Sequence, residues 1–339
     1  GRRMNIYDIS AKAGVSIATV SRVLNGSARV SEKTREKVLA VMRECDYVPN
    51  AFARGLGLNT MKTIGILCAT AADPFLARGI ACLEQSLREN GYDCLLCCSE
   101  YSLEMRQKGV ELLLSKRVDS IVLMGSHYVE NDDANNEYIR QAAKTVPVLL
   151  VNASLAGENI YSILCDDYHA TMEATLTLLD AGRKDILYLY HSHNYSGRKK
   201  LQGYRDALQK RGRPVREELI HYYAIRDRSV QDVRDELLRV AAQGLSFDAV
   251  MTSDDTLAVG AAKYARAAKR SVPRGLSIIG YNNSGLALCT EPELTSVDNK
   301  LDAICHQCVQ TLLGVLSGKE MPQKTVFTAE LAHRGSTIQ

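Results

Sequence analysis

Residues 6–26 read IYDISAKAGVSIATVSRVLNG, and this stretch decides the fold of the N-terminal part of the chain. Ile6, Ile9 and Ala13 are spaced three and four residues apart, as on one face of a helix. Gly14 follows, and glycine adopts the left-handed conformation that ends a helix without steric penalty. The pattern therefore predicts a short helix that stops at a tight turn.

Two further helices are expected after that turn. Ser16 is a favourable N-cap for a helix over residues 17–24, and Ser31 is one for a helix over residues 32–44. Three short helices with a glycine turn between the first two form a helix-turn-helix domain. In such a domain the second helix enters the major groove of DNA and presents its N-terminal residues to the bases. Here those residues are Ile17 and Ala18, with Arg22 one turn further on.

The charge distribution along the 339 residues favours the same interpretation. The net charge is only +3, but residues 1–62 hold 11 Lys and Arg against 5 Asp and Glu, and the rest of the chain is slightly acidic. A small basic head on a larger acidic body is typical of a nucleic-acid-binding module attached to another domain.

Composition excludes several other classes of protein. Hydrophobic residues make up 46% and charged residues 24%, which is ordinary for a globular chain. No apolar run is long enough to span a bilayer, and no apolar segment typical of a secretory signal follows residues 1–4. We therefore expect a cytoplasmic protein with no membrane partner, whose ten cysteines are reduced thiols.

From residue 63 onward, apolar strands alternate with helices. Such alternation predicts parallel sheets covered by helices on both faces, and the number of strands favours two lobes over a single sheet. Ligands of these folds bind at the carboxyl ends of the strands. Strands are expected at 64–69, 92–98, 120–124, 147–151, 186–190, 248–252 and 276–280.

The stretch 6–26, with VSEKTR at 30–35 and YVPNA at 47–51, resembles the headpiece of the lactose-repressor/galactose-repressor (LacI/GalR) family of bacterial transcription regulators. The resemblance continues to RGST at 334–337 and covers nearly the whole chain. It implies a small all-α helix-turn-helix headpiece, a hinge, and an α/β effector domain of two Rossmann-like lobes, as in periplasmic binding proteins. The implied ranges are 1–48 for the headpiece, 49–61 for the hinge and 62–339 for the effector domain, with a first lobe of about 62–165 and 298–324 and a second of about 166–297 and 325–339.

The resemblance also implies roles in DNA binding. Arg22 has the chemistry for a bidentate contact with guanine, and Ile17 and Ala18 can make apolar contacts with a thymine methyl group. Leu56 matches the leucine that paired hinge helices push into the minor groove of the operator. Because the hinge is short and holds glycine at 55 and 57, we expect it to be helical only on DNA. The residues expected to position the DNA backbone are Ser16, Thr19, Ser21, Asn25, Arg29, Ser31, Thr34 and Asn50; for Ser16 and Ser31 simple helix capping is an equal alternative.

In the body, the resemblance implies an effector cleft between the lobes. A small polar ligand, such as a sugar or nucleoside derivative, is expected to control operator binding by a homodimer, most simply as a repressor. The expected effector contacts are Asp73, Phe75, Leu76, Ser126, Asp166, Ser196, Lys200, Met251, Asp254 and Asn282. Asp255 is either a further contact or a helix cap.

Three positions depart from the family pattern. Lys200 stands where arginine is common, and Asn282 and Asn152 stand where aspartate is common. The compact ammonium of lysine thus replaces the planar guanidinium of arginine. At the two asparagines, an amide that can also donate hydrogen bonds replaces a carboxylate that only accepts them. The identity of the effector therefore cannot be carried over from a relative.

Other readings of the sequence are weaker. The pairs Cys94/Cys97 and Cys305/Cys308 have the spacing of zinc ligands, but they fall on a predicted strand and a predicted amphipathic helix, so no metal is expected. His191-Ser192-His193 has no evident catalytic partners and is interpreted as an exposed loop. No phosphate-binding glycine motif is present, so neither a nucleotide cofactor nor an enzyme is indicated. A solute-binding protein of a transporter, or an enzyme on the same fold, remains the alternative.

Overall fold

The computed structural model describes residues 4–224 and 229–339, and for residues 52, 53, 56 and 57 it describes the helix they belong to but not their side chains. The chain divides into two compact units. The first comprises Gly1–Thr63 with Arg117–Asp119, and the second comprises Ile64–Lys116 with Ser120–Gln339.

The headpiece in the first unit has the three expected helices, α1 (Ile6–Ala13), α2 (Ile17–Leu24) and α3 (Glu32–Glu44). Gly14 ends α1 with a φ of 63°, in the left-handed region, as the sequence predicted. The small core has members on all three helices, and they are Ile9, Ala13, Val20, Val23, Val38 and Met42.

The hinge forms a fourth helix, α4 (Ala51–Leu58). That this helix forms only on DNA stays a prediction. The chain after the helix folds back onto it, because the Thr60 amide donates to the Gly55 carbonyl at 3.1 Å. A Cβ atom at Gly55 would lie 2.2 Å from the Met61 sulfur, so glycine here permits a close approach rather than simply weakening the helix. The Met61 amide is in turn held by the Asp119 carboxylate at 3.0 Å.

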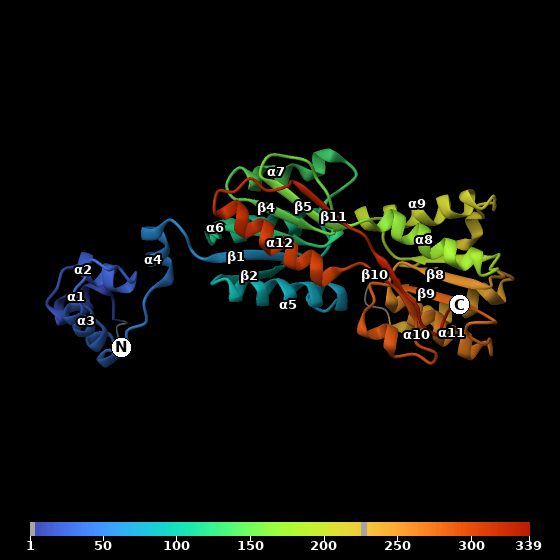
Figure 1. The fold of residues 1–339 in the computed structure, drawn as a ribbon, viewed down its shortest axis with the longest axis horizontal. Helices are drawn as coiled ribbons and strands as arrows, with labels where there is room; N and C mark the ends of the chain where they lie inside the picture. The colour runs from blue at the N-terminus through green and yellow to red at the C-terminus, as the bar shows by residue number, and fades with distance from the viewer. Residues whose placement is uncertain (1–3, 225–228) are drawn as a thin grey trace. The chain divides into compact units, whose positions relative to one another are not determined.

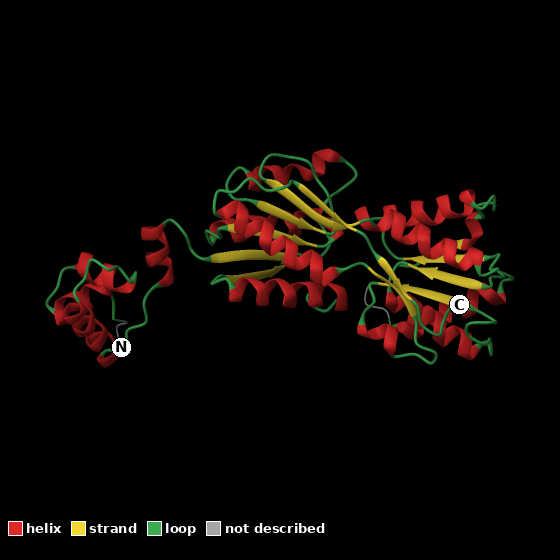
Figure 2. Ribbon diagram, in the orientation of Figure 1, coloured by secondary structure: helices red, strands yellow, loops and turns green. Residues whose placement is uncertain are grey.

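The body contains two six-stranded sheets, each covered by helices on both faces (Figures 1 and 2). In the first lobe the strand order is β11-β5-β4-β3-β1-β2. Helices α5 and α12 share one core with the sheet, α6 contacts β2, and α7 contacts β4. The bounds are β1 (Thr63–Cys68), β2 (Asp93–Cys98), β3 (Ser120–Met124), β4 (Val148–Val151), β5 (Ile160–Cys165), β11 (Lys324–Phe327), α5 (Pro74–Glu89), α6 (Leu103–Ser115), α7 (Glu137–Ala143) and α12 (Leu301–Leu316).

In the second lobe the order is β12-β10-β9-β8-β6-β7, and only β12 is antiparallel to its neighbour among the pairings described. Helices α8 and α9 cover one face and α10 and α11 cover the other (Figure 1). The bounds are β6 (Ile186–Tyr190), β7 (Ile220–Tyr222), β8 (Ala249–Thr252), β9 (Ser277–Tyr281), β10 (Thr295–Asp298), β12 (Glu330–Ala332), α8 (Asp167–Asp180), α9 (Tyr195–Lys210), α10 (Val230–Ala242) and α11 (Asp255–Ala267).

Three segments of the described part of the chain pass between the lobes. The chain leaves β5 for α8 after Cys165, and it leaves β10 for α12 after Asp298. The third passage follows β11, which pairs with β5 as far as Phe327, whereas the sequence had placed this passage near residue 325. In each lobe the carboxyl ends of the parallel strands lie together along one border of the sheet, which we call the strand-end edge of that lobe. It differs from the lateral borders of the sheet, which are formed by the outermost strands.

Candidate DNA and effector sites

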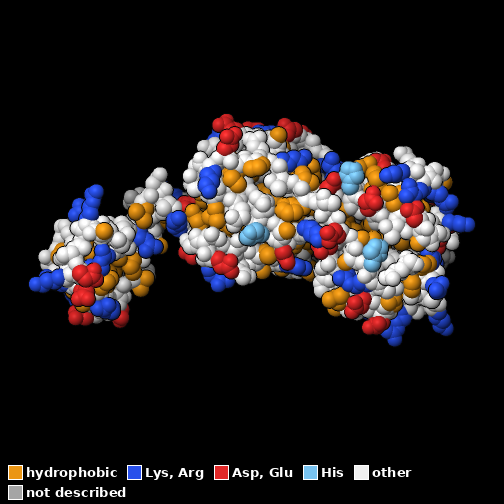
Figure 3. All heavy atoms as spheres, in the orientation of Figure 1, with side chains coloured by type: hydrophobic (Ala, Val, Ile, Leu, Met, Phe, Trp, Pro, Cys, Tyr) orange, Lys and Arg blue, Asp and Glu red, His pale blue; other side chains and the backbone are white. Residues whose placement is uncertain are grey.

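The second helix of the headpiece exposes the residues predicted to read bases. Val20 and Val23 are buried, whereas Ile17, Ala18 and Arg22 are exposed. The side chains of Arg22 and Arg29 make no hydrogen bond or ion pair with any residue in 4–224 or 229–339. Two arginines are thus available to an outside partner, and the visible face of the headpiece also carries acidic side chains (Figure 3).

The hydroxyl groups predicted to contact phosphates also cap helices. Ser16 accepts a hydrogen bond from the Thr19 amide at 3.1 Å, and Ser31 accepts one from the Thr34 amide at 3.3 Å. Each pair of hydroxyls is also in contact, at 2.9 Å. The capping alternative is therefore confirmed for both serines. A phosphate oxygen only accepts hydrogen bonds, so a contact with it would use the hydroxyl proton, which at Ser31 is donated to Oγ1 of Thr34.

The remaining DNA candidates differ in how well they can be placed. Asn25 and Asn50 are exposed and Ser21 is half-buried. Leu56 belongs to α4, but its side chain lies outside the described part of the structure. Tyr7, which is 66% exposed on α1, was not among the predicted DNA contacts.

At the strand-end edge of the second lobe, a histidine faces a carboxylate. Nε2 of His191, which follows β6, lies 2.6 Å from Oδ2 of Asp254, which follows β8. Burial lowers the pKa of His191, but the Asp254 carboxylate raises it by more, so the net shift is upward. Burial raises the pKa of Asp254, and the imidazole lowers it by more. His191 is thus half-buried and paired. The expected loop at 191–193 is present and His193 in it is exposed, so the prediction fails only for the exposure of His191.

Lys200 is buried in the same region. Its ammonium donates to the Ser253 carbonyl at 3.0 Å and lies 3.8 Å from the centre of the Tyr281 ring. Burial lowers the pKa of Lys200, and the carboxylates of Asp167 and Asp254 oppose that shift.

Two further carboxylates near this edge accept hydrogen bonds from hydroxyl groups. Asp167 is buried at the start of α8 and accepts hydrogen bonds from the hydroxyls of Ser196, at 2.6 Å, and of Tyr281. Asp255 accepts from Ser284 and Ser296 at 2.7 Å and is buried. Asp255 therefore has a structural role, but the expected helix cap is wrong, because the N-cap of α11 is Asp254 and Asp255 is the first residue of the helix.

Five buried side-chain atoms lack a partner among the residues described: Nε2 of His127 and oxygen atoms of Thr171, Tyr188, Ser253 and Asn299. Two of these residues directly follow strands of the second lobe, Ser253 after β8 and Asn299 after β10, and they are 6% and 2% exposed. The amide nitrogen of Asn299 donates to Oδ1 of Asn282 at 3.0 Å. Asn282 itself has a φ of 93°, which asparagine tolerates better than most residues. Buried groups without a partner, such as the Ser253 hydroxyl and the Asn299 side-chain carbonyl, are usually satisfied by water or a ligand.

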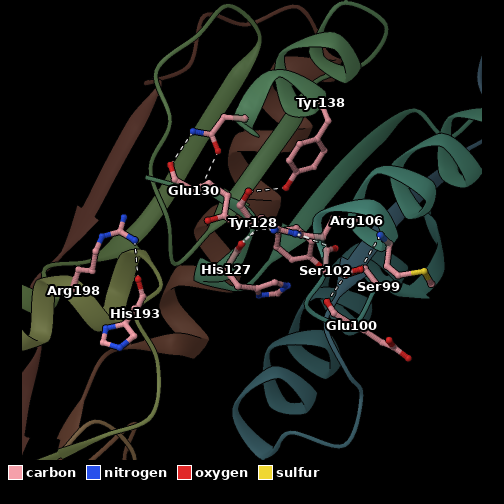
Figure 4. A network of polar contacts seen from close by, with 12 residues as sticks. Ser99, Glu100, Ser102, Arg106, His127, Tyr128, Glu130, Tyr138, His193 and Arg198 are labelled. Atoms are coloured by element: carbon pink, nitrogen blue, oxygen red, sulfur yellow. Dashed lines mark hydrogen bonds and ion pairs between the residues drawn. The ribbon is translucent and has the colours of Figure 1, made fainter. Parts of the chain in front are cut away.

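In the first lobe, a buried arginine fixes the loop after β3. Arg106 donates to the His127 carbonyl and to the Glu130 carboxylate, the latter at 2.5 Å (Figure 4). The Tyr138 hydroxyl donates to the Tyr128 carbonyl at 2.6 Å, so the loop is held from two sides. Burial, and then the Arg106 charge, lower the pKa of His127 to about 3. His127 is therefore neutral at neutral pH.

The other predicted effector contacts fall into two groups. Ser126 lies on the fixed loop and Asp73 caps α5, both at the strand-end edge of the first lobe. Met251 has no exposed surface and packs in the core against α8 and α9, and Phe75 packs against the core of the first lobe. The structure thus leaves Met251 no surface for a ligand.

A cavity of about 750 Å³ opens beside the first passage between the lobes. Asp166 is the predicted effector contact that lines it, together with residues of α8, α9 and β11 such as Tyr168, Tyr195, Arg198 and Lys324. No local pattern predicts this cavity, because its lining combines residues from four separate segments of the chain.

The cysteine pairs lie in core positions or on a strand. Cys305 and Cys308 are fully buried in the first lobe, and burial raises the pKa of Cys308 to about 12. Among the described residues no cluster of His, Cys, Asp and Glu could hold a metal ion, and no helix is long and apolar enough to cross a membrane.

Two family models match the chain. Residues 5–50 match bacterial regulatory proteins of the lacI family, and residues 175–337 match the periplasmic binding protein-like domain. A headpiece of this kind on a two-lobed binding domain defines a ligand-binding class of transcriptional regulator.

Full-length relatives agree with both matches. A helix-turn-helix transcriptional regulator of Lachnoclostridium phytofermentans is 50% identical over 98% of this chain and 99% of its own. The chain therefore belongs to the LacI family, and it is a DNA-binding transcriptional regulator rather than an enzyme.

Solved structures share the fold. The lac repressor dimer bound to operator and the anti-inducer ONPF matches with a TM-score of 0.87 and 24% identity, over the full length of both chains. The complex of the transcriptional regulator CelR with cellobiose matches with a TM-score of 0.69 and 26% identity, over 98% of this chain and 100% of that one.

Proposed function

We propose that this regulator represses transcription in the cytoplasm by binding a two-fold symmetric operator as a homodimer, under the control of a small polar effector. The observation that supports the DNA role most directly is the exposed face of α2, where Arg22 has no partner within the described residues and Ile17 and Ala18 are exposed beside it. A guanidinium with free donors can contact O6 and N7 of guanine together.

The positioning contacts would come from the ends of the helices. The Ser16 and Ser31 hydroxyls sit at the N-termini of α2 and α3, where the helix dipole and free amides favour a phosphate. Arg29, in the loop between them, adds a positive charge. If α4 of each subunit docks in the minor groove, we expect Leu56, which belongs to that helix, to wedge a base step.

Dimerisation is supported by an apolar surface at one edge of the first lobe. β2 is an edge strand, and Leu96 on it is 45% exposed. Leu112 and Met105 on α6 are 48% and 37% exposed. Exposed apolar side chains beside an unpaired strand edge are typical of a contact surface, and a two-fold partner would cover the same surface on both subunits.

The effector would bind between the strand-end edges of the two lobes. CelR binds cellobiose on a similar fold, which supports a small polar ligand here. The side chains available to it include Asp73 and Ser126 in the first lobe and His191, Asp254 and Asn282 in the second.

Selection from a random duplex library tests this function. The full chain should enrich a sequence with two-fold symmetry, since each headpiece of a dimer reads one half-site. Arg22→Ala should lose one base preference within each half-site and keep the symmetry. Failure to enrich any sequence, or enrichment of one without symmetry, would overturn the proposal.

A further inference from the structure

The segments that lead from helices into strands in the second lobe are strongly basic. Four such segments lie at the border of each lobe where the strands begin, opposite the strand-end edge. Those of the second lobe hold ten Lys and Arg against five Asp and Glu, whereas those of the first lobe hold four of each. The segments are 180–185, 210–218, 243–248 and 266–275 in the second lobe, and 89–93, 116–119, 144–147 and 317–323 in the first. We call the border that the four segments of the second lobe form the basic border, and Lys and Arg side chains protrude from this end of the lobe in Figure 3.

Helix dipoles do not account for this excess of positive charge. A cation in the last turn of a helix offsets the negative end of the dipole, and Lys210 and Arg266 occupy such positions in α9 and α11. However, four helices end at this border in each lobe, and only the border of the second lobe is basic. The charge is therefore a property of the second lobe of this chain rather than of the fold.

Hydrogen bonds between the four segments join them into one surface. The Arg183 guanidinium donates to the carbonyls of Asp248, at 3.3 Å, and Pro273, at 3.2 Å, and so ties three segments together. The Arg213 guanidinium donates to the Lys184 carbonyl at 3.3 Å, which adds the fourth segment. The basic side chains therefore belong to one continuous border.

The carboxylates of the basic border are already engaged within the chain. Four of them pair with arginines, and the fifth accepts hydrogen bonds from backbone amides. The contacts are Asp180 with Arg211 at 2.8 Å, Asp185 with Arg216 at 2.8 Å, Glu217 with Arg205 at 2.5 Å, Glu218 with Arg216 at 2.9 Å, and Asp248 with the amides of Lys184 and Asp185 at 2.9 Å. Five exposed cationic side chains make no hydrogen bond or ion pair with any residue in 4–224 or 229–339, and they are Lys184, Lys210, Arg266, Lys269 and Arg274.

The surroundings of these five cations favour a nucleic acid over an acidic protein. Contact surfaces between proteins have an apolar centre and few lysines. No large hydrophobic side chain is exposed on the four segments, all of which the structure describes, and three of the five cations are lysines. Surfaces that bind DNA are instead polar and strongly positive. Duplex DNA is also the polyanion at the highest local concentration around a regulator bound to its operator.

We propose that the basic border is a second DNA-binding surface, which holds the phosphate backbone of a duplex segment other than the one read by α2. Contacts with phosphates carry no base information, so this surface binds any sequence. It ends at the segment before β10, where Glu291 and Glu293 are exposed. A regulator bound at its operator thereby bridges to a second stretch of DNA. The inference goes beyond the proposed function, because neither the headpiece nor the effector site takes part in this contact.

A tethered operator tests the second surface. The full chain would be loaded on an immobilised selected duplex, free protein would be washed away, and a labelled duplex of scrambled sequence would be added at about 50 mM salt. We expect the labelled duplex to bind the loaded surface with a Kd of about 10⁻⁶ M or tighter, and to be released as the salt concentration rises. Binding no greater than that to the immobilised duplex alone would overturn the inference.

Neutral substitutions locate the contact. The variant Lys184→Gln/Lys210→Gln/Lys269→Asn/Arg274→Gln removes four charges that have no partner among the described residues, and asparagine suits position 269, where φ is 55°. Binding of the second duplex should weaken about tenfold or more, and the slope of log affinity against log salt should become shallower by about 3–4. Unchanged binding of the second duplex in this variant would refute the role of the basic border.

A charge-matched variant of the first lobe separates a local contact from an effect of net charge. Lys116→Gln/Lys144→Gln/Lys319→Gln/Lys324→Gln also removes four exposed charges and should bind the second duplex as the unaltered chain does. An equal loss in both variants would overturn the inference. Both variants should keep the operator affinity and the thermal unfolding midpoint of the unaltered chain. If the first variant is unstable, Lys184→Gln/Arg274→Gln should still show about half of its change in salt slope.

Poly-L-glutamate is the probe for an acidic protein partner. At equal concentration of charge, it should displace the second duplex less well than an unlabelled scrambled duplex does, and stronger displacement would overturn the inference. The same experiment separates the two proposals. A loaded operator that binds no second duplex refutes the inference alone, whereas a chain that binds no duplex of any sequence at about 50 mM salt refutes the proposed function as well.

Discussion

At the scale of single residues, Arg22 and Arg29 should differ in what they contribute to DNA binding. Arg22→Ala should cost about 1–3 kcal/mol on the selected operator and relax the preference at one base pair, because a bidentate base contact is lost. Arg29→Ala should weaken binding to all duplexes alike and reduce the salt dependence of binding, as expected for a phosphate contact. Fluorescence anisotropy on operator and scrambled duplexes checks both; an unchanged ratio of the two affinities in Arg22→Ala would contradict base reading.

The His191–Asp254 pair should make stability depend on pH. The raised pKa of His191 contributes stability that is complete below its ordinary value of 6.5 and lost as pH rises through the raised value. The lowered pKa of Asp254 contributes stability that is complete above 3.8 and lost as pH falls through the lowered value. The pair therefore stabilises the fold most between those two ordinary values.

The variant His191→Gln should lower the free energy of unfolding by about 1 kcal/mol near pH 5.5, after allowance for partial exposure. The difference from the wild type should shrink as pH rises through the raised pKa of His191. Urea unfolding at several pH values measures it, with His193→Gln as the control, because the His193 ring contacts tyrosines rather than a carboxylate. If the difference in the free energy of unfolding stays constant with pH, the His191–Asp254 pair is not its cause.

At the scale of elements, helices alternate with the strands of the body as expected, but five of the strands that the structure describes were not predicted from the sequence. Most of these are short, at an edge, or beside a passage between the lobes: β7, β10, β11 and β12 have three or four residues each. They lack the uninterrupted apolar run of a central strand. β5 was missed because Ser162 interrupts its apolar run; that serine accepts a hydrogen bond from the Leu155 amide.

The two hinge glycines should respond in opposite ways to substitution by alanine. Gly57→Ala should favour α4 by about 1 kcal/mol and tighten operator binding several-fold, because alanine is the better helix former. Gly55→Ala should weaken binding, since its Cβ would meet the Met61 sulfur at 2.2 Å and the Thr60 carbonyl at 2.9 Å. Operator affinity, and DNA bending in a gel-shift assay, would be measured for both variants. Equal effects of the two variants would contradict the account of the hinge.

At the scale of the whole molecule, the exposed apolar edge of the first lobe should hold two subunits together. Leu96→Glu/Leu112→Glu should convert a dimer to a monomer in light scattering, because two charges would be desolvated at the contact. Val326→Glu, on the opposite edge strand β11, is the matched control and should leave the dimer intact. A wild-type monomer at micromolar concentration, with and without operator, would refute the dimer.

The two-lobed architecture was predictable from the alternation of strands and helices, but the residues that meet at the strand-end edges were not. Lys200, Tyr281 and Ser253 come from α9, β9 and the end of β8, and only the folded sheet brings them together. For the same reason, Met251 looked like a ligand contact in the sequence and lies in the core of the structure.

The most direct test of the account is the affinity of the full chain for a selected palindromic duplex and for its scrambled counterpart, measured over a series of salt concentrations. The account predicts that the palindrome binds about 10³-fold or more tightly at physiological salt, and that both affinities fall as salt rises because phosphate contacts release counterions. Equal affinity for the two duplexes at every salt concentration would contradict sequence-specific recognition by α2.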